Sequence, residues 1–178
     1  MLGTAYGALG LSEQLIEATR KGLEMDPDSA QACFNTGLAY NRLGKFREAA
    51  EFLSRTVALD GQNETACLEL GKAYRGLGRI REEVQAYRDA LDIRGDFFDA
   101  WLHLGAAYLK VRRGDQAKVA YLETQGKFHL NDPEHIFYFA LGLLALGQKD
   151  QARKHLPKLQ EMAPQFADEL QGYIDGED

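Results

Sequence analysis

Apolar residues recur at helical spacing along the chain, in pairs of short segments separated by glycine-containing turns. One segment has its apolar residues three or four positions apart, at Phe46, Ala49, Ala50, Leu53 and Val57. Such spacing places them on one face of a helix. A Leu-Gly-Lys triplet at residues 43–45 separates this segment from an apolar segment before it, and glycine at such a boundary is a turn signal. The pattern therefore predicts helix, turn, helix.

The helix pairs repeat with a nearly fixed period. Gly37, Gly71 and Gly105 each precede a tyrosine by three positions and lie 34 residues apart, and Ala140 follows 35 residues after Gly105. A period of this length indicates a solenoid of stacked units, each of which buries its apolar face against the next. We expect a single repeat domain over residues 1–178, with units at residues 1–28 (partial), 30–63, 64–97, 98–132 and 133–165.

The unit at residues 98–132 carries the fullest version of the repeated pattern. Its residues are Trp101, Leu104, Gly105, Tyr108, Ala117 and Tyr121. Their spacing resembles the tetratricopeptide repeat, Trp-x2-Leu-Gly-x2-Tyr followed by Ala-x3-Phe. The resemblance implies an all-α, right-handed α-solenoid of helix-turn-helix repeats. Residues 166–175 add an apolar stripe with acidic residues opposite, which predicts a C-terminal capping helix over the last unit.

The two cysteines, Cys33 and Cys67, occupy the same position in their units, a position that Trp101 and Ile136 hold in the later units. In tetratricopeptide proteins this position packs between helices, so the resemblance implies buried thiols. Neighbouring helices lie about 8–10 Å apart, whereas a disulfide needs Cα atoms within about 7 Å. We therefore expect both thiols to be free.

Polar residues, prolines and glycines mark the expected helix ends. The candidate N-caps are Asn63, Asp96 and Asp132, whose side chains can accept hydrogen bonds from a first helical turn. Pro157 should kink or break the second helix of the last unit around residues 153–157, because proline removes a backbone hydrogen bond. Gly126 weakens the second helix of the preceding unit and predicts an irregular turn after it.

Composition excludes several classes of function. The chain has 178 residues and a formal net charge of −6, whereas a protein that binds nucleic acid needs a strongly basic face. No apolar run approaches 18 residues, and no Lys or Arg precedes Arg20, which argues against a membrane-spanning helix and a secretory signal. We expect a cytoplasmic protein with no nucleic-acid ligand and no membrane insertion.

The sequence lacks the short motifs that carry catalysis or cofactor binding. It contains no Gly-x4-Gly-Lys-Ser/Thr, no Gly-x-Gly-x2-Gly and no His-Glu-x2-His. The histidines are His103, His129, His135 and His155, and they lack the close paired spacing of metal ligands. We therefore expect a protein that is not an enzyme and holds no cofactor and no metal.

With catalytic and cofactor motifs absent from the sequence, the candidate function is a binding surface. In tetratricopeptide proteins the first helix of each unit lines a concave groove, and the resemblance places the groove positions of this chain at Phe34, Leu38, Asn41, Arg42, Leu68, Lys72, Arg75, Leu102, Lys110, Phe137 and Leu141, with Gly76, Ala106, Leu109, Leu144 and Ala145 beside them. An apolar row near Lys and Arg suits an extended or helical peptide that offers hydrophobic anchors and a carboxylate. We expect a non-catalytic scaffold that binds a peptide segment of a protein partner. The competing interpretation is an apolar row shielded by neighbouring helices and a solvated set of cations.

Two functions of other classes stay open. The chain could be a regulatory or substrate-recruiting module of a larger enzyme, which sequence on either side of residues 1 and 178 would decide. It could also be a helical-repeat RNA binder, since such proteins have a similar period, although they carry a basic groove and bind with strong salt dependence.

We predict weak self-association through the first unit. No preceding unit covers its apolar residues, which are Leu2, Leu9, Leu11 and Leu15. Apolar surface left in water costs about 25 cal/mol per Å². Burying this surface against a second copy recovers that free energy, which offsets part of the entropy lost on association. Sedimentation should therefore depend on concentration, and Leu9→Lys should abolish that dependence. A strict monomer at high concentration contradicts the prediction, and loss of the dimer only in Phe98→Lys moves the interface to the Phe97–Phe98 junction.

Overall fold

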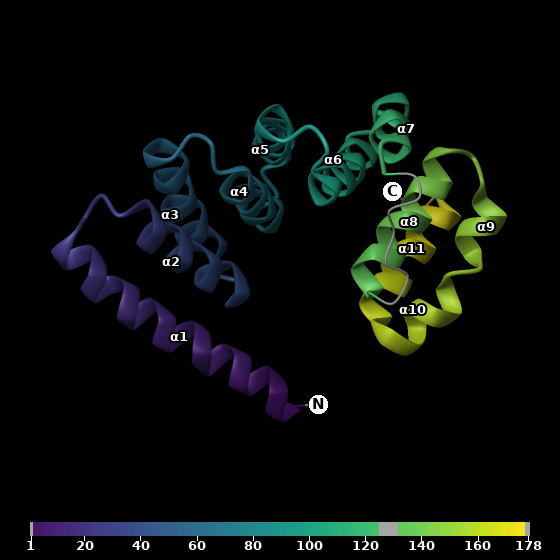
Figure 1. The fold of residues 1–178 in the computed structure, drawn as a ribbon. Helices are drawn as coiled ribbons and strands as arrows, with labels where there is room; N and C mark the ends of the chain where they lie inside the picture. The colour runs from purple at the N-terminus through teal and green to yellow at the C-terminus, as the bar shows by residue number, and fades with distance from the viewer. Residues whose placement is uncertain (1, 125–131, 177–178) are drawn as a thin grey trace. The chain divides into compact units, whose positions relative to one another are not determined.

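The computed structural model describes residues 2–124 and 132–176, and the side chains of residues 10–117, 119–124 and 132–176. Throughout this part of the chain the regular structure is α-helical (Figure 1). The prediction of an all-α helical-repeat fold is confirmed. The irregular turn predicted after Gly126 lies outside the described residues.

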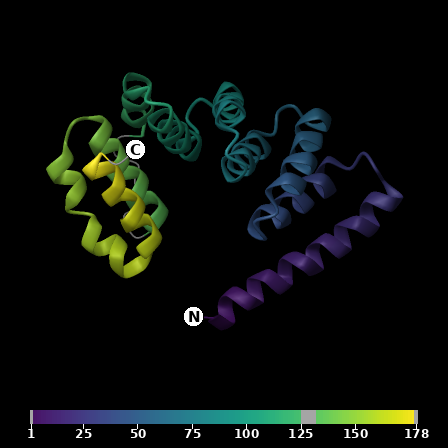
Figure 2. The ribbon, with the colours of Figure 1, turned by 180° about the vertical axis from the view of Figure 1, so that it is seen from behind.

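The helices group into two compact units, Met1–Gly95 and Asp96–Asp178. The first contains α1 (Leu2–Met25), α2 (Ala30–Arg42), α3 (Phe46–Leu59), α4 (Glu64–Gly76) and α5 (Ile80–Ile93), and each of these helices packs against the next. The second contains α6 (Phe98–Lys110), α7 (Gly114–Leu122), α8 (Pro133–Ala145), α9 (Lys149–Arg153), α10 (Leu156–Met162) and α11 (Pro164–Asp175). In the second unit α8 contacts α6 and α7, and α11 lies against α8 and α10 (Figure 2).

A close approach between two helices holds three of the helix pairs together. The glycine of the repeated pattern in the first helix lies against a large side chain sixteen residues later in the second: Gly37 with Leu53, Gly71 with Tyr87 and Gly105 with Tyr121. A Cβ on Gly37 would lie 2.6 Å from Cγ of Leu53, nearer than the 3.0 Å that real Cβ atoms keep. Because a protein core is packed to crystal density, glycine here provides the space that the large side chain fills.

The Tyr121 ring joins two helix pairs of the second unit. It packs on Gly105 of α6, and a Cβ on Gly142 of α8 would lie 3.0 Å from its Cγ. The side chain is 2% exposed, so one ring fills the space between α6 and α8.

The turns inside the helix pairs use a left-handed residue at one repeated position. Gly44, Gly78 and Gly147 have φ of 69°, 69° and 77° there, and Arg112 occupies the same position with φ of 56°. Glycine adopts this conformation without steric cost, whereas a residue with a side chain pays about 1–2 kcal/mol. Among the described residues, Arg112 is the one non-glycine residue with positive φ.

The cysteine position is a core position, as predicted. Cys33 and Cys67 are free thiols with 0% and 2% exposure, and Ile136 at the same repeat position is fully buried. Trp101, at the same repeat position, is only half-buried.

Two of the three predicted N-caps are confirmed. Asn63 accepts a hydrogen bond of 2.8 Å from a main-chain N–H in the first turn of α4, and Asp132 accepts one of 2.8 Å in the first turn of α8. The prediction for Asp96 is wrong, since Phe97 is the N-cap residue of α6 and makes no side-chain capping bond. The N-caps Ser29, Asn63 and Phe97 are 34 residues apart, so the cap position of this unit falls one residue after Asp96.

The first helix departs from the repeat pattern. Residues 2–25 form one continuous helix, with Gly10 inside it at the position that Gly44 holds in its turn. A Cβ on Gly10 would meet no atom within 4 Å. A turn gives up backbone hydrogen bonds and is compensated only when the two helices pack together. The helix-turn-helix pattern expected in the first unit is therefore not formed.

The second helix of the last pair is interrupted near Pro157, as the sequence predicted. α9 ends at Arg153 and α10 begins at Leu156 with Pro157 in its first turn. α11 then covers this pair with Leu170 and Ile174, which are 0% and 1% exposed. The predicted capping helix is confirmed.

The residues expected to mediate self-association differ in exposure. Leu11 is 68% exposed, while the side chains of Leu2 and Leu9 lie outside the described residues. Phe97 is buried, and the Phe98 ring packs edge-on against His135 at 5.4 Å. Self-association stays a prediction, and Leu11→Lys tests it at a described side chain.

Gly71→Ala should destabilise the protein, because its methyl group would overlap the buried Tyr87 ring. We expect a loss of about 1–3 kcal/mol in the free energy of unfolding, measured in urea. Gly22→Ala is the matched control, since a Cβ there meets nothing within 4 Å and alanine in a helix stabilises by about 0.5–1 kcal/mol. Equal effects of both substitutions would contradict the packing role of the repeat glycine.

The thiols should react slowly in the native protein. Burial raises the pKa of Cys67 to about 11 and also raises the pKa of Cys33. At pH 8 a pKa of about 11 leaves roughly one thiol in a thousand as the reactive thiolate. Labelling of Cys67 should therefore be slow, accelerate as pH rises toward 11, and become fast after unfolding in guanidinium. Rapid native labelling of both cysteines would refute their core positions.

Candidate functional site

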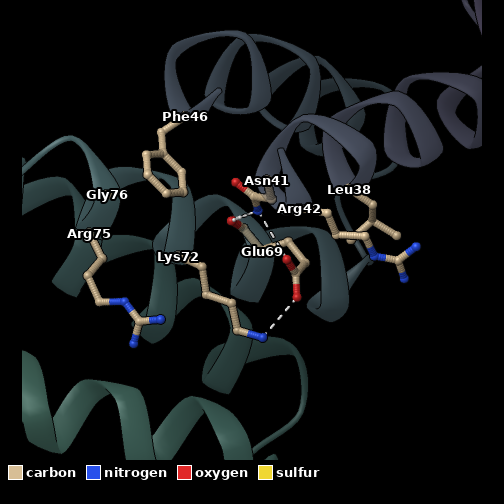
Figure 3. Close-up of a pocket in the computed structure, with 8 residues that line it drawn as sticks. All are labelled: Leu38, Asn41, Arg42, Phe46, Glu69, Lys72, Arg75 and Gly76. Atoms are coloured by element: carbon tan, nitrogen blue, oxygen red, sulfur yellow. Dashed lines mark hydrogen bonds and ion pairs between the residues drawn. The ribbon is translucent and has the colours of Figure 1, made fainter. Parts of the chain in front are cut away.

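The first unit has a cavity of about 380 Å³ between α2 and α4 (Figure 3). Its lining residues are Leu38, Asn41, Arg42, Phe46, Glu69, Lys72, Arg75 and Gly76. Five of the eleven principal groove positions expected from the sequence meet here, together with Gly76. Phe46 and Glu69 were missed, because Phe46 belongs to a second helix and Glu69 falls between the groove positions of α4.

Glu69 organises the polar side of this cavity. The Nδ2 group of Asn41 donates to the main-chain oxygen of Glu69 at 2.9 Å and to its Oε2 at 3.0 Å. The Lys72 ammonium contacts Oε1 of the same carboxylate at 2.9 Å. One carboxylate thus holds a side chain of α2 and a side chain of α4 in place.

The Asn41 amide links α2 to α4 at this cavity. Its Oδ1 atom is buried and, counted over the described residues, has no hydrogen-bond partner. Because the Nδ2 group already donates to two oxygens, the orientation of the amide is determined. A buried acceptor without a donor costs about 1–3 kcal/mol, so the two bonds that the Nδ2 group donates offset a real cost at this amide.

The cavity has an excess of positive charge. Arg42, Lys72 and Arg75 line it with a single acidic residue, Glu69, although the whole chain has a net charge of −6. In Figure 3 the side chains of Lys72 and Arg75 extend to the same side of the cavity, and the Arg42 guanidinium lies near Leu38. An anionic group is therefore favoured on the Lys72 and Arg75 side.

Phe46 and Leu38 supply the apolar part of the lining, and both are partly exposed. A Cβ on Gly76 would collide with the Phe46 ring. The absence of a side chain at Gly76 thus lets the ring lie over α4 and form a wall of the cavity.

The other predicted groove residues lie elsewhere. Phe34 is partly exposed and packs against the core of the first unit, and Lys110 is exposed in the second. The buried members are Leu68, Leu102, Phe137 and Leu141, with exposures of 3%, 1%, 3% and 1%. Phe137, for example, stacks on Phe166 of α11 at 5.0 Å. These four residues contribute to packing, and a contact between any of them and a peptide stays a prediction.

The second unit has a larger cavity of about 750 Å³. The end of α6 and the following turn contribute Leu109, Lys110 and Arg112, and α11 with its C-cap contributes Glu169, Gly172, Tyr173 and Gly176. Lys110 and Leu109 were expected in the groove, whereas the α11 residues carry no groove signal because the repeat pattern ends before them.

Among the described residues, no helix is long and apolar enough to cross a membrane. In the same part of the chain, no three His, Cys, Asp or Glu side chains are grouped so that they could hold a metal ion.

Comparisons with known proteins agree with the repeat pattern. A tetratricopeptide repeat model matches residues 1–64, and a second tetratricopeptide repeat model matches residues 64–97. No curated protein matches the chain. The crystal structure of MamA is 25% identical, with a TM-score of 0.66 over 86% of this chain and 89% of that chain.

Two other solved structures share the fold. TTC0263, a thermophilic tetratricopeptide protein of Thermus thermophilus, is 22% identical, with a TM-score of 0.66 over 98% of this chain and 94% of that one. A mutant O-GlcNAc transferase of Thermobaculum terrenum is 21% identical, with a TM-score of 0.59, and the match covers 71% of this chain but 26% of the transferase.

Helix pairs of this period, stacked through repeated close contacts, define a protein-interaction scaffold. The chain belongs to the tetratricopeptide repeat family, whose models match it continuously over residues 1–97.

Proposed function

We propose that the scaffold is non-catalytic and that the α2–α4 cavity binds an extended peptide segment of a protein partner. The segment carries a carboxylate next to an apolar side chain. The observation that supports this most is the cluster of three cations around a single acid in a chain that is acidic overall.

Each part of such a segment has a complementary group in the cavity. Lys72 and Arg75 suit the carboxylate, and Leu38 with Phe46 suits the apolar side chain. Glu69 limits the charge that the cavity accepts, because it already neutralises Lys72 at 2.9 Å. A segment with one carboxylate is therefore preferred over a strongly acidic one.

One alternative keeps a specific observation in its favour. The fold match to the transferase covers 26% of that chain, so repeats of this kind also occur within a larger enzyme. A recruiting module of such an enzyme would use the same cavity for a substrate peptide, and the peptide experiment applies to both functions.

Arg75→Glu should weaken binding of a carboxylate-containing peptide by about tenfold or more, because a hydrogen bond to a charged group is worth about 1.5–3 kcal/mol. Random peptides on an array, followed by fluorescence anisotropy of the selected sequences, supply the ligand and the affinity. The variant should change the free energy of unfolding by only about 0.5 kcal/mol.

Arg88→Glu is the matched control, since it makes the same charge change at an exposed position of α5 away from the cavity lining. Equal weakening of peptide binding by both variants would show that the effect comes from the net charge of the protein and not from Arg75 itself. Selection of peptides without Asp or Glu would refute the proposed ligand, and tighter binding of single-stranded RNA with steep salt dependence would favour the nucleic-acid alternative.

A further inference from the structure

We propose that Lys72 changes partners when a peptide binds. Glu69 holds its ammonium group in the free protein, and the carboxylate of the peptide takes the place of Glu69 in the complex. This exchange rests on the function proposed for the α2–α4 cavity. It makes Glu69 a positioning residue, because Glu69 acts on the ligand through Lys72.

The two carboxylate oxygens of Glu69 have different partners (Figure 3). Oε2 accepts a hydrogen bond of 3.0 Å from Nδ2 of Asn41 on α2, and the same Nδ2 group donates to the main-chain oxygen of Glu69 at 2.9 Å. Oε1 contacts the Lys72 ammonium at 2.9 Å. Departure of Lys72 therefore leaves both bonds from Asn41 in place.

Lys72 is the more accessible member of the ion pair. Its side chain is 29% exposed, against 16% for Glu69, and both line the cavity. The ammonium group lies at the end of a flexible four-carbon stem, whereas the Glu69 carboxylate is tied to a second helix through Asn41. An entering ligand thus meets a cation that can turn and a carboxylate that stays where it is.

The ion pair is weak enough to be exchanged. Glu69 and Lys72 lie three residues apart in α4, and pairs between neighbours on one helix contribute little, because solvent screens them and side-chain freedom is lost. A peptide carboxylate replaces this pair by an equivalent one. Its neighbouring apolar side chain is buried against Leu38 and Phe46 as well. The exchange therefore lowers the affinity for the peptide only by a small factor.

Glu69→Gln tests the exchange, since it removes the charge and keeps the size of the side chain. The probe acetyl-Leu-Asp-Leu-amide is titrated into the full chain, and the amide NMR signal of Gly76, a lining residue, reports binding. We expect the variant to bind the probe about two- to fivefold more tightly than the wild type, which is the range of a weak ion pair. The Asn analogue of the probe should bind equally to both proteins. Unchanged or weaker binding of the Asp probe by the variant would overturn the proposal.

Glu51→Gln is the matched control, because it makes the same charge change at an exposed position of α3 outside the cavity lining. We expect it to leave the affinity for the probe unchanged. A gain as large as that of Glu69→Gln would assign the effect to long-range charge and refute the exchange.

A double-mutant cycle with Lys72→Gln separates exchange from direct repulsion between two carboxylates. If Glu69 acts through Lys72, the gain from Glu69→Gln disappears when Lys72→Gln is already present. A gain that persists in this background would mean that Glu69 repels the ligand directly, which contradicts the exchange.

The wild-type protein provides a test that does not depend on the folding of a variant. During titration with the probe, the NMR signal of the Lys72 Cε methylene should shift, while the side-chain amide signals of Asn41 keep their positions. A Lys72 signal that stays in place while the Gly76 signal shifts would overturn the proposal.

The same titrations distinguish failure of the exchange from failure of the proposed function. Binding by the wild type without a gain in Glu69→Gln refutes the exchange and supports the peptide site. Binding by Glu69→Gln alone supports the exchange, because the free protein then blocks its own cation. Binding by neither protein refutes both.

Discussion

The fold depends on how closely the two helices of a pair approach each other. Gly37, Gly71 and Gly105 contribute no side chain, and the space is filled by a leucine or a tyrosine from the second helix. The approach fixes the axial register of the two helices, and the register in turn determines which residues of the first helix remain at the surface. At the cavity between α2 and α4, Asn41 of one pair reaches Glu69 of the next and donates two hydrogen bonds to it.

The repeat period predicted most of the helices because the packing contacts recur with it. The buried cysteines, the caps at Asn63 and Asp132 and the break at Pro157 follow from local chemistry that the sequence displays directly. Asp96 failed as a cap because it lies one residue before the position that Asn63 holds in the preceding repeat. The continuity of α1 was missed because a turn glycine such as Gly10 permits a turn and does not enforce one.

The candidate site was only partly predictable for a similar reason. A repeat pattern assigns each position to a face of its helix, so Leu38, Lys72 and Arg75 were placed together. It does not say how far a neighbouring helix covers that face, and Leu68, Leu102, Phe137 and Leu141 are buried as a result. Nor does it show the partner of a charge: Glu69 neutralises Lys72 through an ion pair within α4. The burial of a helix face and the ion pairs of its charged side chains depend on the folded structure, so the repeat pattern does not predict them.

The Tyr121 ring has a consequence for how the array can evolve. It packs on Gly105 in its own helix pair and on Gly142 in the following one. Repeat arrays lengthen and shorten by duplication and deletion of whole units. A unit inserted between these two pairs would have to present a small residue to Tyr121 and supply a ring of its own for Gly142. Growth of the array at this junction is therefore restricted to units that carry both a small residue for Tyr121 and a ring for Gly142. The helix surface at Gly172 is open, so no such condition applies there.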